Sequence, residues 1–337
     1  MIQGLSSRAR LSVPPPKKDL ETHWEAYKLR PDKLGLDSLN DPYHGWVNEH
    51  RDDASLESKQ RIMGTLTINP NLPEFYAFFQ AFPKVEIVTS LLIRRQFYRK
   101  IAANSLDYKS LISLNLPSTL RELYIFEDFN KLLHSERSTK RANRSLGRAL
   151  SKSSRFLENL SAAFLVNAED FFANLWPTNE QNSNIIPWEN LRKLALTSRL
   201  LHPEIGRGKI NKLLIAAGRA AAFMPKLEVM EIWNGGEEHA CLFRYSNDAG
   251  KPKITWACNW GSHVQLVNNV VHCWANLPRH RQHPHGNLTT VVNRLRRGRK
   301  QVKTYVATVR YLKLRSSVLD LISDYQLFWE EYNHSKG

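Results

Sequence analysis

The fold of this chain is decided by the stretch Phe223–Gly236, FMPKLEVMEIWNGG. Pro225 ends a helix there, because proline has no backbone N–H to donate and its ring clashes with the preceding turn. The strand that follows fits the pattern L-x-x-L-x-I, whose first, fourth and sixth side chains are expected to point into a core. Gly235 and Gly236 close the strand with a turn. Upstream of Pro225, apolar residues recur on one helix face at Ile210, Leu213, Leu214, Ala217, Ala221 and Met224.

The same unit of helix, proline and strand recurs upstream in weaker form. Helices are predicted over 74–82, 105–114 and 146–156. The first apolar positions of the five strands are Val88, Leu120, Leu157, Leu191 and Leu227, at intervals of 32, 37, 34 and 36 residues. A strand and a helix in a unit of about 35 residues cannot bury their own apolar faces, but stacked copies can.

We therefore predict an α/β fold, an irregular leucine-rich-repeat-like solenoid of strand–helix units with a C-terminal helical cap. The repeats are irregular because the period exceeds the usual range of about 20 to 29 residues. They also lack the asparagine that normally follows the strand pattern. An ordinary α/β sandwich with a similar alternation of elements is the alternative.

The composition and the sequence pattern divide the chain into three predicted segments. Residues 1–55 are rich in charge and proline and predict a loosely ordered extension, whereas 56–236 hold the strand–helix repeats. Residues 237–337 predict a hairpin around the turn Asn247–Gly250, then helices and the cap. The expected elements of this last segment are strands at 240–245, 253–257 and 311–314, a helix carrying Val264, Val267, Val271 and Trp274, and a final helix at 318–332 with Ser317 as its N-cap.

The overall charge favours an acidic partner. The 337 residues contain 48 Lys and Arg against 32 Asp and Glu, a net charge of +16, which suits a nucleic acid or another anionic surface. A basic protein that uses this charge for solubility alone is the alternative. The three cysteines have no paired spacing, so we expect no disulfide framework and a reducing compartment. Because neither a secretory signal nor an apolar run of membrane-spanning length occurs, we expect an intracellular protein, cytoplasmic or nuclear, with no membrane partner.

No motif in the sequence indicates catalysis. The carboxylate pairs Glu127-Asp128 and Glu169-Asp170 would have to converge for acid–base chemistry, and helix capping explains each pair more simply. His280, His283 and His285 lie near Cys273, but a structural zinc site needs two close-spaced ligand pairs. Nucleophile-elbow, phosphate-binding and dinucleotide-binding glycine motifs are absent from the sequence. We predict a protein that is not an enzyme and that has no catalytic, cofactor-binding or metal-binding residues.

Two surfaces are candidates for binding a partner. One is a basic helix face formed by Arg144, Arg148, Lys152 and Arg155, opposite the apolar face of the same helix. The other is the outward row of the strands, the fifth position of each pattern: Leu92, Tyr124, Ser161, Ala195 and Glu231. Within this row Tyr124 and Glu231 are large enough, and polar enough at the tip, to anchor a partner. The partner-binding candidates are thus Tyr124, Glu231, Arg144, Arg148 and Lys152. The alternatives are solvated faces without a partner and, for the strand row, cover by the N-terminal arm. Eight Lys or Arg and no acidic residue between Arg279 and Lys303 form a further basic stretch.

Four stretches carry a resemblance to a known family: KVEIVTSLLIRRQF at 84–97, IFEDFN at 125–130, LALTSRLL at 194–201 and MEIWNG at 230–235. Over roughly residues 56 to 333 the chain resembles fungal F-box-type proteins, whose C-terminal half is a leucine-rich-repeat-like domain of unknown function. The resemblance implies a substrate-recognition arm, in which an N-terminal F-box would dock a Skp-type adaptor of a cullin ubiquitin ligase. No Leu-Pro-x-Glu opening followed by an apolar three-helix run precedes residue 56; a truncated gene model and a member that lost the box both fit this departure.

These observations favour a protein-binding scaffold. Its more specific form is a substrate-recognition subunit of a cullin-type ubiquitin ligase, as the resemblance implies. A basic nucleic-acid-binding protein without catalytic activity is the alternative, because of the net charge of +16.

Overall fold

The computed structural model divides the chain into two compact units, Met1–Thr67 and Ile68–Gly337. It describes residues 46–47, 50–51, 90–96, 116, 118–127, 144–177, 185–236, 238–260, 266–278, 287–295, 305–319 and 324. In the first unit, β1 (Trp46–Val47) and β2 (His50–Arg51) form a short antiparallel pair. The expected extension over 1–55 otherwise lies outside the described residues, as do the predicted helices at 74–82 and 105–114. The segment boundaries expected near 55 and 236 remain predictions.

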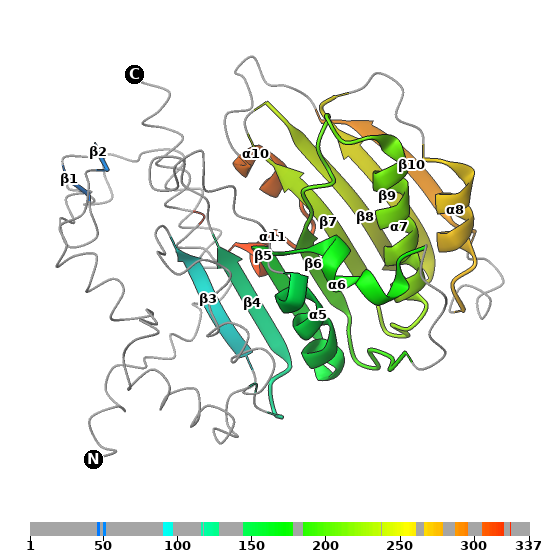
Figure 1. Cartoon of the computed structure of the whole chain (residues 1–337), viewed down its shortest axis with the longest axis horizontal. Helices are drawn as coiled ribbons and strands as arrows, with labels where there is room; N and C mark the ends of the chain where they lie inside the picture. The colour runs from blue at the N-terminus through cyan, green and yellow to red at the C-terminus, as the bar shows by residue number, and fades with distance from the viewer. Residues whose placement is uncertain are drawn as a thin grey trace. The chain divides into compact units, whose positions relative to one another are not determined.

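The second unit is built on an eight-stranded sheet with the strand order β10-β9-β8-β7-β6-β5-β4-β3 (Figure 1). Its first five strands in the chain run parallel: β3 (Ser90–Gln96), β4 (Glu122–Glu127), β5 (Asn159–Asn167), β6 (Lys193–Thr197) and β7 (Val229–Gly235). After these, β8 (Ala240–Asp248) pairs antiparallel with both β7 and β9 (Lys251–Cys258), and β10 (Thr289–Arg294) pairs parallel with β9. The α/β class is therefore confirmed, and the sheet runs on without a break beyond residue 236.

The strand register agrees with the spacing of the sequence pattern. Leu92 pairs with Tyr124, Tyr124 with Ser161, Ser161 with Ala195, and Ala195 with Glu231. These are the fifth positions of the five predicted strands, so the intervals of 32, 37, 34 and 36 residues are also the offsets between paired residues. The pattern located all five parallel strands because each needs apolar side chains at fixed positions to bury one face.

Helices cover one face of the sheet (Figure 1). They are α5 (Arg144–Ser153), α6 (Ala168–Phe171), α7 (Arg207–Ala221) and α8 (Asn268–Ala275), with single 3-10 turns at Ser154–Phe156 and Ala173–Leu175. The opposite face carries α10 (Val306–Val309) and α11 (Arg315–Val318). Each face has its own cluster of buried apolar residues, so the sheet from β4 to β9 is covered on both sides.

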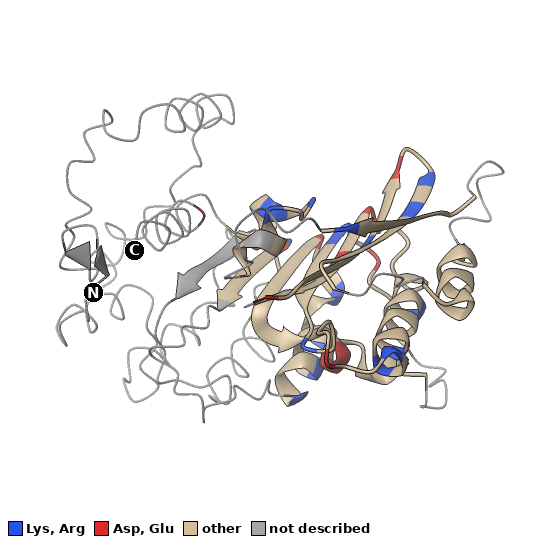
Figure 2. Ribbon diagram, turned by 90° about the horizontal axis from the view of Figure 1, so that it is seen from above, with Lys and Arg blue, Asp and Glu red and all other residues tan. Residues whose placement is uncertain are grey.

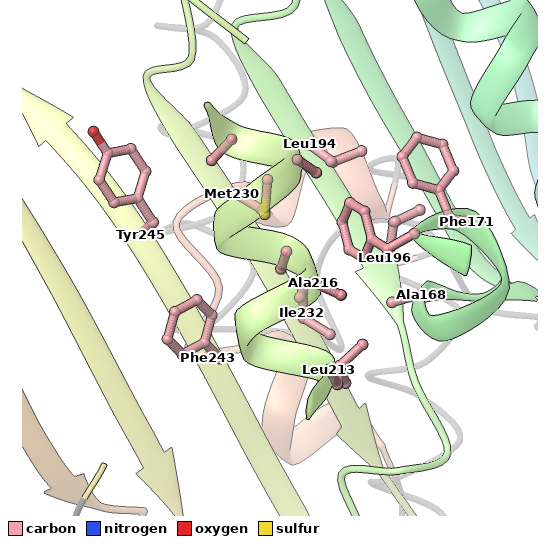
Figure 3. Packing of buried hydrophobic residues seen from close by; sticks show 14 of the residues in the cluster. Ala168, Phe171, Leu194, Leu196, Leu213, Ala216, Met230, Ile232, Phe243 and Tyr245 are labelled. Atoms are coloured by element: carbon pink, nitrogen blue, oxygen red, sulfur yellow. The ribbon is translucent and has the colours of Figure 1, made fainter. Parts of the chain in front are cut away.

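Figure 3 shows the part of the helix-side core that lies under α7. Leu213 and Ala216 of this helix belong to the same buried cluster as Met230 and Ile232 of β7. The small residues of α7 also allow α8 to approach: a Cβ added at Gly218 would lie 2.8 Å from the Cys273 sulfur. The alanine-rich composition that predicted this helix therefore also sets its close packing.

The hairpin predicted around Asn247–Gly250 is present between β8 and β9. Asp248 pairs with Lys251, which leaves Ala249 and Gly250 as the two turn residues, with φ of 52° and 78°. Two successive positive φ values are typical of the type I′ turn, whose twist matches that of the flanking strands. The predicted hairpin is therefore confirmed, with each strand slightly longer than expected.

Several C-terminal expectations were wrong or lie outside the described residues. Residues 311–314 form turns between α10 and α11, not a strand, because two of their N–H groups bind a side chain of the sheet instead of a neighbouring strand. The expected helix at 318–332 does not start at Val318, since α11 ends there and Leu319 is extended with Ser317 inside α11. Beyond Leu319 the structure describes Asp324 alone, so the helical cap remains a prediction. Conversely, β10 was not expected within the basic stretch, although its β-branched run Thr289–Val292 was a signal for it.

Candidate functional site

The outward row of the strands lies under the C-terminal segment of the chain. We call residues 305–319, which include α10 and α11, the C-terminal strap. Ser161, Ala195 and Glu231 of the row are buried, and the strap residues Val306, Val309, Leu314 and Val318 form one apolar cluster with the same face of the sheet. The register of the row is as predicted, but the expectation of a free outward surface at Glu231 was wrong.

Glu231 holds the strap to the sheet. Its side chain is 0% exposed, and its Oε1 and Oε2 accept hydrogen bonds from the backbone N–H groups of Lys313 (2.8 Å) and Leu314 (2.9 Å). The Nε of Arg244, the residue paired with Glu231 on β8, lies 2.5 Å from Oε1. Arg244 also donates through Nη2 to the backbone carbonyl of Tyr311. A buried carboxylate needs such partners, and their presence makes Glu231 an anchor within the chain and not a contact for another protein.

Tyr124 lies at the margin of this covered region. It is half-buried, and its pKa is raised to about 12 by burial first and by the negative charge of Glu122 second. A hydrogen bond with Ser317 of the strap acts in the opposite direction. Tyr124 thus has hydrogen-bonding neighbours within the chain, and its role in binding a partner remains a prediction.

The basic face of α5 is where the sequence placed it. Arg144, Arg148 and Lys152 are all exposed, while Leu146 and Leu150 on the same helix are buried. Figure 2 marks the Lys and Arg positions of the described chain in blue along the ribbon. We name these three cations the α5 row. In the described part of the chain their acidic neighbour is Asp170 of α6, whose Oδ1 lies 4.0 Å from Arg144 Nε. Burial raises the pKa of Asp170, and the charges of Arg144 and Arg148 partly offset this shift. The row therefore presents three cations to solvent, beside one half-buried carboxyl.

Arg155, the fourth member of the predicted basic face, has a different role. Its guanidinium carbon lies 3.2 Å from the ring centroid of Trp188, and burial lowers the pKa of the guanidinium to about 10. This cation–π contact fixes Arg155 inside the protein. The helix spacing alone could not separate it from the exposed cations, because it lies beyond the end of α5, in the following 3-10 turn.

A second group of polar side chains, which sequence reasoning did not identify as a site, lies where β5 and β6 end. Ser198 donates from Oγ to Glu169 Oε2 at 2.6 Å, and burial raises the pKa of Glu169. Nearby, Phe164 has a left-handed φ of 59°, and its N–H donates to Thr197 Oγ1 at 2.8 Å. These hydrogen bonds are all made within the chain. Binding sites in parallel sheets most often form at the carboxyl ends of the strands. The predicted ends of β5 and β6 were therefore the sequence signal that could have identified this group.

The predicted carboxylate pairs do not form a catalytic pair in the described residues. Glu169 contacts Ser198, whereas Asp170 faces Arg144, so the two side chains have different surroundings. Neither caps α6, whose N-cap is Asn167 without a side-chain hydrogen bond. Glu127 ends β4, and Asp128 lies outside the described residues.

The raised pKa of Glu169 predicts how stability depends on pH. As the pH rises, this carboxyl ionises first in the unfolded chain, so its ionisation favours unfolding until the pH exceeds the folded pKa. Glu169→Gln has no ionisable group at this position. As the pH rises above about 4, its free energy of unfolding should therefore increase relative to that of the parent. Urea unfolding of both proteins at a series of pH values measures this difference.

Ser198→Ala provides the control for this prediction. The hydroxyl of Ser198 lowers the pKa of Glu169 in the folded protein, so its loss should extend the pH-dependent decrease in stability to higher pH. If the free energies of unfolding of the parent and of Glu169→Gln change in parallel across the whole pH range, the pKa of Glu169 is not raised in the folded protein.

No metal centre is found in the part of the chain that the structure describes. There, no three His, Cys, Asp or Glu side chains are grouped closely enough to hold an ion. His280, His283 and His285 lie outside the described residues. Cys241, Cys258 and Cys273 are free thiols whose pKa values are raised by burial. The described helices include none with both the length and the apolarity required to cross a bilayer.

Comparison with known proteins gives one match. The model of a family described as "Family of unknown function (DUF6546)" matches residues 115–320. No curated protein matches the chain. No solved structure matches it.

Proposed function

Because the match covers more than half of its residues, the chain belongs to this family of unknown function (DUF6546), and we propose that it is a protein-binding scaffold. We further propose that its strand–helix units form an irregular leucine-rich-repeat-like solenoid with a C-terminal cap. The five parallel strands with paired equivalent positions support this proposal. Stacked units of this kind create long continuous surfaces that suit a protein partner.

The observation that carries the proposal is the exposed α5 row. The strand face, which would be the first choice in a solenoid, is occupied by the strap between β4 and β8. By contrast, Arg144, Arg148 and Lys152 project from a rigid helix whose apolar face is anchored in the core. Cations held by a rigid element favour an acidic protein surface, because their positions require little ordering on binding.

A more specific role is a substrate-recognition subunit of a cullin-type ubiquitin ligase. The resemblance to fungal F-box-type proteins supports this role, with the acidic partner as the substrate. The lack of an F-box opening before residue 56 weighs against direct docking to a Skp-type adaptor through that segment.

The second candidate is a nucleic-acid-binding protein without catalytic activity. The same α5 row and the net charge of +16 favour it, since cations that neutralise phosphates release counterions and increase affinity. Aromatic side chains that could stack on bases are absent from α5 itself. The protein partner is therefore preferred.

Charge reversal of the α5 row tests both candidates. We expect the triple variant Arg144→Glu, Arg148→Glu, Lys152→Glu to recover the protein partner from a nuclease-treated fungal extract at least about tenfold less well than the parent does. The three side chains are exposed, so the melting temperature should change little. Quantitative mass spectrometry of the captured proteins measures the difference.

A matched control lies on α7, which exposes the cations Arg207, Lys209 and Lys212 on the same layer. Reversing these three changes the net charge equally, and we expect the partner to remain bound because α6 lies between the two helices. Either of two results would replace the first candidate with the second. In one, nuclease treatment abolishes all capture by the parent. In the other, nucleic acid is the sole captured species and added salt releases it.

A further inference from the structure

The strand β10 forms an open edge of the sheet. It is the last strand in the sheet order, and among the described residues no strand pairs with its outer side. Five of its six residues are exposed and Val291 is half-buried, with Val292 48% exposed. An edge strand with so little cover offers its backbone to another chain.

One hydrogen bond fixes which backbone groups point outward. The N–H of Leu295 donates to the carbonyl of Cys258 on β9 at 3.0 Å, so position 295 faces β9. Because successive residues of a strand alternate, the N–H and C=O groups of Thr290, Val292 and Arg294 point away from the sheet. Three donors and three acceptors are thus arranged along one line at the spacing of a missing strand.

Two of the devices that usually protect such an edge, proline and a bulge, are absent from β10. It contains no proline, and its register with β9 is continuous from Thr289 to Arg294, without a bulge. On β10 and the segment of β9 paired with it, the described charged residues are Arg294 and Lys253, both exposed cations. The sequence continues with Arg296 and Arg297 directly after the strand.

We propose that the outer edge of β10 binds an extended acidic segment of a protein partner by strand addition. Backbone hydrogen bonds to positions 290, 292 and 294 provide the pairing, and the cations select glutamate or aspartate in the added strand. A second copy of this chain fits the edge poorly, because its β10 has no acidic residue to meet these cations. A nucleic acid cannot satisfy the line of alternating donors and acceptors.

The edge is separate from the α5 row, so the two proposals fail independently. The α5 row lies on the helix next to β5, whereas β10 is at the far end of the sheet order. Reversal of the α5 row should leave binding at the edge unchanged.

The test uses a fluorescein-labelled peptide of alternating valine and glutamate, with fluorescence anisotropy as the readout. Val292→Pro removes one outward N–H without removing a hydrogen bond to β9, and we expect it to weaken binding at least about tenfold. Val292→Thr keeps the N–H and the β-branch, and its affinity should stay within about threefold of that of the parent. Equal thermal unfolding of the two variants shows that the sheet remains folded.

Charge and backbone are then separated with other peptides and one further variant. A valine–lysine peptide, which has the opposite charge, and a proline–glutamate peptide, which has too few N–H groups, should each bind at least about tenfold more weakly than the valine–glutamate peptide. Arg294→Glu should also weaken the valine–glutamate peptide without removing any backbone group.

Several results would overturn the proposal. They are equal binding of the valine–glutamate and proline–glutamate peptides, unchanged affinity of Val292→Pro, or no measurable binding by the parent. A dimer of the parent that Val292→Pro abolishes would also overturn it, since the edge would then bind a second copy.

Discussion

Replacing Glu231 by alanine is expected to lower the free energy of unfolding by about 3 to 5 kcal/mol, because it removes one partner of a buried ion pair. The change leaves the guanidinium of Arg244 without its carboxylate. It also leaves the N–H groups of Lys313 and Leu314 without an acceptor at the start of α11. Each of these groups then has to be buried unpaired or be exposed to water by release of the strap.

These two outcomes, unpaired groups that stay buried and release of the strap, can be separated by measurement. Urea unfolding gives the loss of stability, and hydrogen exchange at residues 306–319 reports whether the strap has detached from the sheet. Because the strap-side apolar cluster is large, we expect exchange to rise over the strap first and in the parallel strands last.

A second ion pair on the same strap provides the matched control. Lys313 Nζ lies 2.6 Å from Asp248 Oδ1, and both side chains are largely exposed. Asp248→Ala should therefore cost less than about 1 kcal/mol, as is usual for surface pairs. If Glu231→Ala costs as little as Asp248→Ala, the carboxylate does not anchor the strap.

The parallel strands could be predicted from the sequence because the signal is local and repeated. The strands β4 to β7 each turn apolar side chains toward the helices, so the pattern recurs in each of these units. The residues that occupy one position of the pattern, such as Tyr124 and Glu231, were therefore assigned to the same row before their register was known.

The cover over that row could not be predicted, because it comes from a distant part of the chain. Glu231 and Lys313 are hydrogen-bonded across 82 positions in the sequence. Nothing in the strand pattern distinguishes an outward glutamate that meets solvent from one that binds the N–H groups of a returning segment. The turns at 311–314 were predicted as a strand for the same reason, since their apolar residues pack onto the sheet without joining it.

The candidate binding surface was predictable to a similar extent. Helical spacing correctly placed Arg144, Arg148 and Lys152 on the exposed side of α5, because the opposite side had to be buried. It could not show that Arg155 is covered by Trp188, a contact between a helix end and a residue of the loop before β6. The open edge at β10 depends on strand order, which periodicity does not determine.

The contact between Arg155 and Trp188 leads to the second large expected effect, a loss of stability on replacement of Trp188. Trp188 is fully buried, its Nε1 donates to Ser154 Oγ at 3.0 Å, and its ring stacks with Phe171 at a centroid distance of 5.8 Å. Trp188→Ala should therefore cost about 3 to 5 kcal/mol of unfolding free energy, because it leaves a large cavity between α6 and the end of α5. Chemical denaturation at equilibrium measures this loss.

Part of that loss should come from Arg155, and a double-mutant cycle can isolate this part. The guanidinium has one buried nitrogen, Nη1, with no hydrogen-bond partner, so the indole face is its main compensation for burial. Arg155→Met keeps much of the side-chain volume without the charge, and in the Trp188→Ala background it should recover about 1 kcal/mol or more. Trp188→Phe, which keeps an aromatic face but loses the hydrogen bond to Ser154, should lie between the parent and Trp188→Ala. Strict additivity of Trp188→Ala and Arg155→Met would mean that the ring contributes packing alone and does not stabilise the buried cation.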